Sequence, residues 1–205
     1  MAYDAPADGL FQIPGRVDSP VIDANHVTMD RRSFLRLLAA SAASAGLWTR
    51  SQGSSDKWGD VLPTRELGAT RERVTCLGLG GFHIGWTTEK LAASTIEAAL
   101  EEGIRFFDNA ESYGPETSEI RYGRYLTPKY RDQVYLMTKS QARDAKTARQ
   151  HIEDSLRRMK TDTIDLWQIH SVRDPDDVDA RIDNGVLEEG LKAQAEGKIR
   201  HLGFT

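Results

Sequence analysis

Residues 104–114 read IRFFDNAESYG, and this segment decides the expected fold. Its mostly apolar start, 104–107, is typical of a short buried strand, and Asp108 follows directly at the carboxyl end of that strand. Tyr113 comes five residues later, in the loop that leaves the strand. The segment therefore predicts a carboxylate and a phenol at the same end of a buried strand.

The same arrangement occurs twice more along the chain. The apolar run 134–137 leads to Lys139, and the mostly apolar stretch 164–169 leads to His170. Each of these ionisable side chains follows at least four mostly apolar residues, so each is expected at the carboxyl end of its strand. Together with Asp108, they close three successive predicted strands.

Strands and helices alternate through the whole region after Thr64. Predicted strands begin near residues 77, 104, 134, 164 and 199, a repeat of about thirty residues. Apolar residues at helical spacing predict intervening helices near residues 88–102, 118–126, 148–159 and 187–195. A short hairpin is expected before the first of these strands, over residues 65–76.

This alternation requires parallel strands joined by right-handed crossovers. Two architectures satisfy it, a doubly wound open sheet and a (β/α)8 barrel. In a parallel barrel the carboxyl ends of all strands share one rim, which is where catalytic groups gather. Asp108, Tyr113, Lys139 and His170 would then converge on one pocket, which favours the barrel.

Composition excludes several classes of function. The 205 residues carry 27 Lys and Arg against 31 Asp and Glu, a net charge of −4, which argues against a nucleic-acid binder held by phosphate contacts. The single cysteine, Cys76, rules out a disulfide framework and a cysteine-rich metal site, and no metal site is expected. The chain contains no run of 18 apolar residues, so no conventional membrane span is expected.

The first sixty residues are expected to precede the fold. Residues 1–30 are rich in Pro and Gly and show no sustained period, so we interpret them as disordered. The sequence RRSFLR at 31–36, the weakly apolar run 37–48 and the small residues 43–45 resemble a bacterial twin-arginine export signal with its cleavage site. The alternative is a leader that merely contains two arginines, in a cytoplasmic protein. Residues 49–60 are expected to form a linker.

The residue types on the predicted rim suit proton delivery to a carbonyl oxygen. A Tyr phenol has an ordinary pKa of about 10, and a neighbouring ammonium such as that of Lys139 makes the proton easier to release. Asp108 would hold that ammonium in place, and His170 would orient a substrate oxygen. Reduction of a carbonyl also needs a hydride, which no side chain supplies, so we expect a nicotinamide cofactor.

The motifs that carry these residues resemble the aldo-keto reductase family, from residue 65 to residue 205. The matching stretches are FDNAESYG at 107–114 with Ser118, Glu119 and Gly123, then TK at 138–139, DLWQIH at 165–170 and GKIRHLG at 197–203. The resemblance implies a (β/α)8 barrel that reduces aldehydes or ketones with NADPH. It also implies that Tyr113 donates the proton, that Lys139 and Asp108 tune it, and that His170 orients the carbonyl.

Four other residues are expected near the rim, and three histidines away from it. Asn109 and Tyr122 stand where the family more often has Thr and Leu, and we expect them to reshape the pocket wall. His83 and Trp86 follow the first strand and either line the rim or are simple packing. No role is assigned to the remaining histidines that the sequence places away from the rim, His26, His151 and His201.

Two alternatives to a barrel enzyme stay open. The segment GLGGFH at 78–83 is similar to a dinucleotide phosphate loop, which would indicate a Rossmann-type dehydrogenase. Against it, the third glycine is replaced by His83, and the predicted helix begins about seven residues later than that loop requires. The second alternative is a regulatory barrel subunit that binds the cofactor without catalysis.

Length limits what the chain is expected to contain. A complete barrel takes about 250 residues, so residues 61–205 are expected to form an incomplete barrel of five strands. The resemblance places most cofactor-binding residues after residue 205, so none is assigned here and residues 1–205 alone are not expected to bind NADPH tightly. The acidic stretch 171–185 is expected to be a loop that either excludes anionic substrates or is a solvated face.

Overall fold

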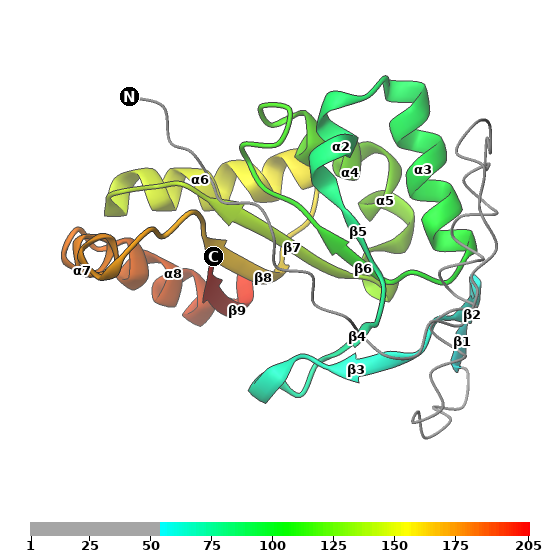
Figure 1. Cartoon of the computed structure of the whole chain (residues 1–205), viewed down its shortest axis with the longest axis horizontal. Coiled ribbons are helices and arrows are strands. Elements are labelled where there is room, and N and C mark those ends of the chain that lie inside the picture. Colours follow the sequence, from blue (N-terminus) through cyan, green and yellow to red (C-terminus); the bar gives the residue numbers. More distant parts are fainter. Residues whose placement is uncertain (1–53) are drawn as a thin grey trace, which may run out of the picture.

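A five-stranded parallel sheet organises the fold. In the computed structural model, which describes residues 54–205, the sheet contains β5 (Gly78–Gly80), β6 (Phe106–Asp108), β7 (Tyr135–Ser140), β8 (Ile164–Ile169) and β9 (Ile199–Phe204). The strands lie in the order of the sequence, β5-β6-β7-β8-β9, and every neighbouring pair is parallel (Figure 1).

The strand order distinguishes the two expected architectures. A doubly wound sheet reverses direction at a switch point, as in the order 3-2-1-4-5-6, whereas the strands of a barrel follow the sequence round the ring. The order β5 to β9 contains no reversal. The described sheet is therefore that of a partial barrel, and the Rossmann alternative is not supported.

Helices connect the strands and cover one side of the sheet. They are α2 (Gly81–Trp86), α3 (Glu89–Glu101), α4 (Thr117–Tyr125), α5 (Thr127–Tyr130), α6 (Ala145–Met159), α7 (Pro175–Asp183) and α8 (Val186–Ala195). Their starts follow local capping chemistry: the Thr88 hydroxyl accepts from Leu91 N at 3.3 Å to begin α3, and the Asp144 carboxylate accepts from Thr147 N at 2.9 Å to begin α6.

The hydrophobic core lies between these helices and the sheet. The predicted stripe of α6, Ala148, Ile152, Leu156 and Met159, is buried there against strand residues such as Trp167. Burial of a large apolar side chain stabilises the fold by about 1.5–3 kcal/mol. The helical spacing therefore predicted the inward face of α6 correctly.

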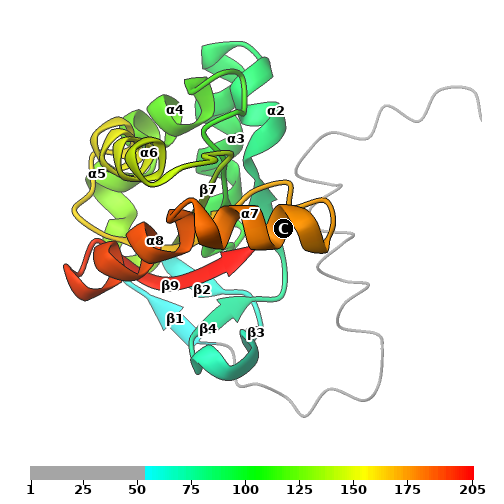
Figure 2. The same ribbon diagram turned by 90° about the vertical axis from the view of Figure 1, so that its left-hand side faces the viewer.

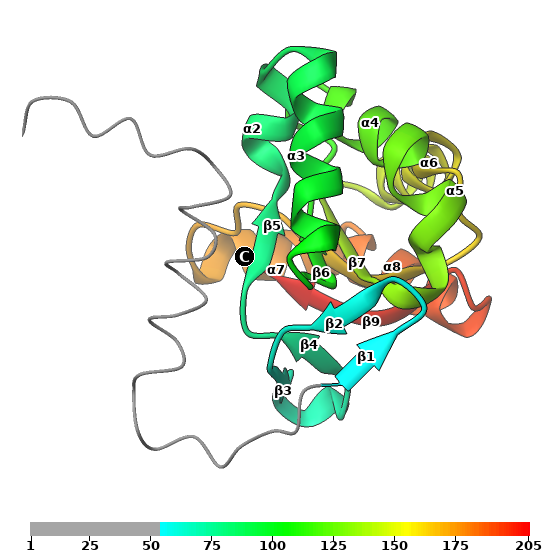
Figure 3. The same cartoon turned by 90° about the vertical axis from the view of Figure 1, so that its right-hand side faces the viewer.

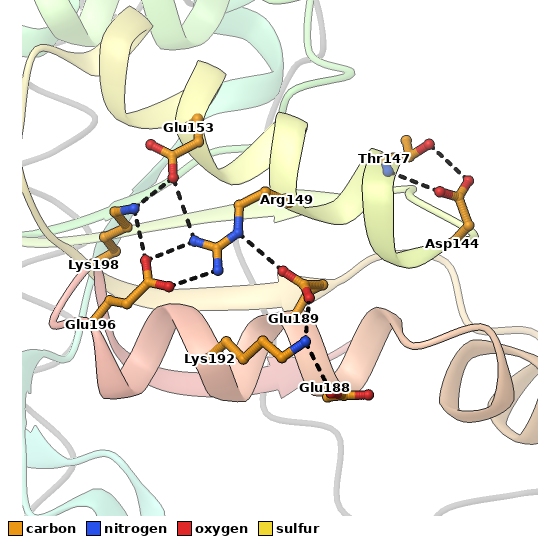
Figure 4. A network of polar contacts seen from close by, with 9 residues as sticks. All are labelled: Asp144, Thr147, Arg149, Glu153, Glu188, Glu189, Lys192, Glu196 and Lys198. Atoms are coloured by element: carbon orange, nitrogen blue, oxygen red, sulfur yellow. Dashed lines mark hydrogen bonds and ion pairs between the residues drawn. The ribbon is translucent and has the colours of Figure 1, made fainter.

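Ion pairs join α6 to α8 at the surface (Figure 4). The guanidinium of Arg149 donates twice to Glu196, each at 2.7 Å, and once to Glu189 at 3.0 Å. Lys198 adds contacts with Glu196 at 2.7 Å and with Glu153 at 2.6 Å. These cations lower the pKa of Glu196 to about 2, so the carboxylate stays charged and the two helices remain tied together at neutral pH.

Two hairpins lie at the end of the sheet opposite α2 (Figures 1 and 3). The predicted one is formed by β3 (Thr64–Glu66) and β4 (Arg73–Thr75), joined by a short turn. The other, formed by β1 (Ser54–Asp56) and β2 (Gly59–Val61), occupies residues that we expected to be linker. Figure 2 shows both hairpins beneath β9.

Two contacts explain why the linker prediction is wrong over residues 54–60. Asp56 accepts from the Nε of Arg105 at 2.7 Å and from its Nη2 at 3.0 Å, and the Arg105 side chain is buried. The Trp58 ring lies 4.6 Å from the ring of Tyr130. The segment reads as polar and Gly-rich, but one carboxylate and one indole attach it to the folded unit.

Three helices were also missed, and one of them, the short α5, follows the expected end of α4 at residue 126. The segment GFHIGW was expected to be a loop but forms α2, which begins directly after β5, so the argument from a late helix start was wrong. The acidic stretch after His170 contains α7, in which Asp174 caps the first turn and Asp177 binds Arg143 and Arg181. These two acids serve the helix, so the expectation of an irregular loop is corrected.

The predicted disordered leader and twin-arginine signal, residues 1–48, lie outside the described residues. Within residues 54–205, none of the helices combines the length and the apolar character that crossing a membrane requires.

Candidate active site

Lys139 is the centre of the candidate active site. It lies near the carboxyl end of β7 with 6% of its surface exposed. Its ammonium donates to the Asp108 carboxylate, to the backbone oxygen of Asn109 at 2.7 Å and to the phenol oxygen of Tyr113 at 3.2 Å. Three oxygen partners hold this buried side chain in one position.

The fold explains why these groups meet. Strands β6 and β7 are parallel neighbours, so Asp108 and Lys139 leave the sheet at the same edge. The loop after β6 then turns back towards β7, because Glu111 N donates to Lys139 O at 3.1 Å and Gly114 adopts a φ of +69°. This turn carries Tyr113 to the ammonium.

His170 completes the group from the neighbouring strand. Its backbone N donates to Ser140 O at 2.8 Å, which keeps the ends of β7 and β8 together. The imidazole ring meets the Tyr113 ring edge-on at 6.2 Å, and its Nδ1 lies 2.7 Å from the Thr205 hydroxyl. The structure thus brings all four residues expected on the rim, Asp108, Tyr113, Lys139 and His170, to one place.

The surroundings of His170 favour a neutral imidazole. Partial burial lowers its pKa below the ordinary 6.5, and the Lys139 ammonium lowers it further, while Asp108 opposes the shift. The Thr205 hydroxyl oxygen already accepts from Ser171 N at 3.2 Å, so we assign its proton to Nδ1, which puts the proton of the neutral ring on Nε2. His170 can therefore donate a hydrogen bond without carrying charge.

An aromatic cluster from α2 lies beside Tyr113. The Phe82 ring meets the Tyr113 ring edge-on at 5.5 Å, and it lies at a tilt to the Trp86 ring, 6.3 Å away. Both side chains are largely exposed, Phe82 by 51% and Trp86 by 60%. Gly85 permits this approach, because a Cβ there would lie 2.5 Å from Tyr113 O. We call Phe82 and Trp86 the aromatic pair.

Sequence reasoning anticipated only half of this pair. Trp86 was predicted either to line the rim or to be simple packing, and no role was predicted for Phe82. Phe82 and Trp86 are four residues apart, so they lie on the same face of a helix. This spacing predicts the pair only if the segment is a helix, and it was expected to be a loop. His83, from the same helix, lies 5.3 Å from the Phe82 ring.

The expected effect of Asn109 and Tyr122 on the pocket wall is corrected. Tyr122 belongs to α4, is fully buried in the core, and packs edge-on against Phe107 at 5.8 Å. Its hydroxyl donates to Asp108 O at 3.2 Å, and burial raises its pKa well above the ordinary value. Asn109 is also fully buried, with its Nδ2 4.0 Å from the Met159 sulfur. Both residues therefore support the site from the core and do not form its wall.

Comparison with known proteins identifies the family. The family model described as "Aldo/keto reductase family" matches residues 76–205, which is more than half of the chain. The chain belongs to the aldo/keto reductase family.

Curated relatives of this family member include two bacterial reductases. The chain is 40% identical over 153 residues to aldo-keto reductase YhdN of Bacillus subtilis, which covers 67% of the chain and 43% of the relative. It is 33% identical over 161 residues to 6-dehydroglucose reductase of Novosphingobium aromaticivorans, which covers 69% of the chain and 50% of the relative. The chain thus spans about half the length of these relatives.

Solved structures of the family are similar over the same region. An aldo-keto reductase of Bacillus halodurans in its holo form matches with a TM-score of 0.60 and 30% identity, over 70% of the chain and 50% of the other protein. An aldo/keto reductase of Klebsiella pneumoniae in complex with NADP and acetate matches with a TM-score of 0.60 and 27% identity, over 70% and 50% of the two chains. The five-stranded sheet is therefore the corresponding part of a (β/α)8 barrel.

Proposed function

We propose that this protein reduces an aldehyde or a ketone to an alcohol with NADPH. The observation that carries the proposal is the 3.2 Å contact between the Lys139 ammonium and the phenol oxygen of Tyr113. A proton donor must bear negative charge after it has given up its proton, and a buried cation at that distance stabilises this charge. Family membership and the NADP complex of the Klebsiella pneumoniae relative support the same reaction.

Tyr113 is the proton donor in this account. Its hydroxyl would donate to the carbonyl oxygen of the substrate, and the proton would pass to that oxygen as negative charge develops on it. Lys139 would stabilise the phenolate that remains, while the Asp108 carboxylate and the Asn109 carbonyl keep the ammonium from moving. Asp108 therefore acts by holding Lys139 in place.

His170 orients the substrate in this account. Its Nδ1 is engaged with Thr205, so we assign Nε2 to the carbonyl oxygen of the substrate. A neutral imidazole donates a hydrogen bond there and leaves the proton transfer to Tyr113. The His170 and Tyr113 rings are nearly perpendicular, with centroids 6.2 Å apart. The Nε2 of His170 and the hydroxyl of Tyr113 can therefore approach the same substrate oxygen.

The residues present fit a nicotinamide cofactor. Gln168 pairs in register with Lys139 across β7 and β8, and its Oε1 is buried with no hydrogen-bond partner among the described residues. An amide N–H, such as that of a carboxamide, would satisfy this acceptor. Bound NADPH would supply the hydride that the side chains cannot supply. Gln168 is therefore the residue of this chain that we assign to the cofactor.

The aromatic pair favours apolar substrates. Phe82 and Trp86 expose large apolar surfaces beside the proton donor, and burial of such a ring contributes about 25 cal/mol per Å² of apolar surface. We therefore propose that the carbonyl group of the substrate is attached to an apolar or aromatic group. The name of one relative, 6-dehydroglucose reductase, makes a sugar aldehyde the natural comparison compound.

The geometry does not favour a regulatory subunit without catalysis. Such a subunit would not need the proton donor, its cation and the orienting histidine in contact, yet Tyr113, Lys139 and His170 lie together. A catalytic role explains this arrangement, so we retain it as the single function.

The first test is a reductase assay on the whole protein. NADPH oxidation is followed at its absorbance maximum with benzaldehyde, an aliphatic aldehyde of similar size and 6-dehydroglucose. The proposal expects turnover with at least one carbonyl compound, and kcat/KM highest for benzaldehyde. NADPH binding without turnover of any compound would support the regulatory subunit. Preference for the sugar would overturn the apolar substrate class alone.

We also propose that residues 1–48 direct export through the twin-arginine machinery. The support is the sequence RRSFLR at 31–36, followed by a weakly apolar run and the small residues 43–45. Fusion of residues 1–60 to a reporter protein tests this location. Export that requires Arg31 and Arg32 supports it, whereas export that persists in the Arg31→Lys, Arg32→Lys double variant, or no export, contradicts it.

A further inference from the structure

A second polar cluster lies between α6 and the strand ends that carry the candidate active site. It contains Glu111 from the loop after β6, Ser140 from the end of β7 and His151 from α6. The Nδ1 of His151 lies 2.6 Å from the Glu111 carboxylate and 2.8 Å from the Ser140 hydroxyl. We call these three residues the brace. None of them has a part in the reaction described above.

The brace does not have the geometry of a hydrolytic triad. In a triad the histidine uses one ring nitrogen for the serine and the other for the carboxylate. Here Ser140 and Glu111 both contact Nδ1, so the nitrogen that donates to the carboxylate cannot also take a proton from the serine. Ser140 is therefore not activated as a nucleophile, and the cluster needs another explanation.

Glu111 ties the loop of the proton donor to β7. Its carboxylate accepts from Gln141 N at 2.8 Å, and its backbone N donates to Lys139 O at 3.1 Å. These two bonds lie on either side of Ser140 and fix the loop only two residues before Tyr113. Movement of Glu111 would therefore move the phenol relative to the ammonium.

Ser140 ties β7 to the orienting histidine. The residue is 1% exposed, its backbone oxygen accepts from His170 N at 2.8 Å, and its hydroxyl accepts from Ala142 N at 3.1 Å. His151 reaches both Ser140 and Glu111 through one nitrogen. The helix α6 is thereby connected to both strand ends that present Lys139 and His170 and to the loop that presents Tyr113.

The charges around Glu111 show what His151 does there. The pKa of the Glu111 carboxyl is raised, mainly by burial and also by the nearby Glu119, while the Gln141 amide, His151 and Arg158 oppose this shift. A buried carboxylate loses its fixed position when its donors are removed. His151 supplies the donor that comes from α6, so Glu111 depends on it for its place.

We propose that His151 is a positioning residue of this reductase, which acts through Glu111 and Ser140 to set the distance between the Tyr113 phenol and the Lys139 ammonium. The inference rests on the proposed function, because the readout is the rate of proton transfer from Tyr113. It adds three residues, Glu111, Ser140 and His151, to the machinery of the site. An error of about 1 Å in such a distance lowers rate by about 100-fold.

The test compares three variants of the whole protein. His151→Leu removes the donor, whereas His151→Asn keeps an N–H near the position of Nδ1. His201→Asn is the matched control, because His201 also contacts a glutamate, Glu72, at 3.3 Å, but the brace does not include it. The measurements are kcat, the KM for NADPH, the solvent deuterium isotope effect on kcat and the melting temperature.

The proposal expects a specific pattern. His151→Leu lowers kcat by about 10- to 100-fold, leaves the KM for NADPH within about 2-fold and raises the solvent isotope effect, since proton transfer becomes limiting. His151→Asn recovers kcat to within about 3-fold of the wild type, and His201→Asn behaves as the wild type.

Other results overturn the proposal in distinguishable ways. An unchanged kcat and isotope effect in a folded His151→Leu protein would show that the brace has no part in positioning. An equal loss in His151→Leu and His151→Asn would also refute it, because the N–H would then be irrelevant. Absence of turnover in the wild type with every carbonyl compound would instead refute the proposed function, before the brace is tested.

Discussion

The phenol of Tyr122 donates a hydrogen bond to the backbone oxygen of Asp108 across 3.2 Å and lies 3.4 Å from the backbone oxygen of Leu79. The hydroxyl is fully buried and joins α4 to the ends of two neighbouring strands. It therefore supports the strand end that presents Asp108 to the ammonium of Lys139.

Tyr122→Phe tests this support. The variant keeps the ring and removes the hydroxyl, so it leaves a buried carbonyl oxygen with one donor fewer and lowers the free energy of unfolding by about 1 kcal/mol. Urea denaturation measures the change. Tyr125→Phe is the control, because the Tyr125 hydroxyl bonds to Glu89 at an exposed site. Equal stability of the Tyr122→Phe variant and the wild type would show that the bond contributes nothing.

The contact between Asp56 and Arg105 predicts that the first hairpin is part of the folded unit. Asp56→Ala removes a charged hydrogen-bond partner of the buried guanidinium and should lower the free energy of unfolding by about 2 kcal/mol. Asp60→Ala, in the same hairpin but exposed, is the control and should change it by less than about 0.5 kcal/mol. Equal effects of the two variants would contradict this interpretation.

The same pair predicts a pH dependence with a definite sign. Arg105 holds the pKa of Asp56 below the ordinary 3.8. A carboxyl whose pKa is lower in the folded state stabilises above its unfolded pKa, and this contribution is lost as pH falls through the folded value. The stability difference between wild type and Asp56→Ala should therefore be constant from pH 7 to 5 and shrink below about pH 4. A difference that is unchanged in acid would contradict the assignment.

His170 predicts a separate loss of stability in mild acid. Its pKa is lower in the folded state than the ordinary 6.5, so the unfolded chain binds the proton more readily. This residue therefore destabilises the fold progressively as pH falls below 6.5. Melting temperatures of wild type and His170→Gln, measured from pH 7.5 to 5.0, should converge as the pH falls or cross in favour of the variant. Parallel curves would refute the shift.

Lys139 is predicted to affect the chemical step. Lys139→Met removes the cation beside the Tyr113 phenol and should lower kcat by about 100-fold or more, since a general acid loses the charge that stabilises its anion. Lys129→Met, at an exposed position in α5, is the control for loss of a lysine. A Lys139→Met protein that folds and retains full turnover would exclude this role.

Local sequence patterns were sufficient to predict the strand ends that carry the site and the inward face of α6. Strand ends are visible because four or more mostly apolar residues precede Asp108, Lys139 and His170. The stripe of α6 is visible because its apolar residues recur at helical spacing. Both features depend on the periodicity of neighbouring residues, and the structure confirms both.

The parts that sequence did not predict depend on contacts between distant residues. The hairpin at Ser54–Val61 is held by Arg105, which lies 49 residues after Asp56. His151 was assigned no role, but Glu111 and Ser140 reach its ring from two other elements. No local pattern in α6 distinguishes His151 from an exposed polar residue. Its partners can be recognised only after β6, β7 and α6 are placed in space.

The central claim is that Tyr113 delivers the proton, and Tyr113→Phe tests it most directly. The variant keeps the ring that packs between Phe82 and His170 and removes only the oxygen beside Lys139. The measurement is NADPH-dependent reduction of the best carbonyl substrate by the whole protein, with NADPH binding followed in parallel. We predict that kcat falls by about 1,000-fold while NADPH affinity stays within about 3-fold. Turnover within about 3-fold of the wild type would contradict the account.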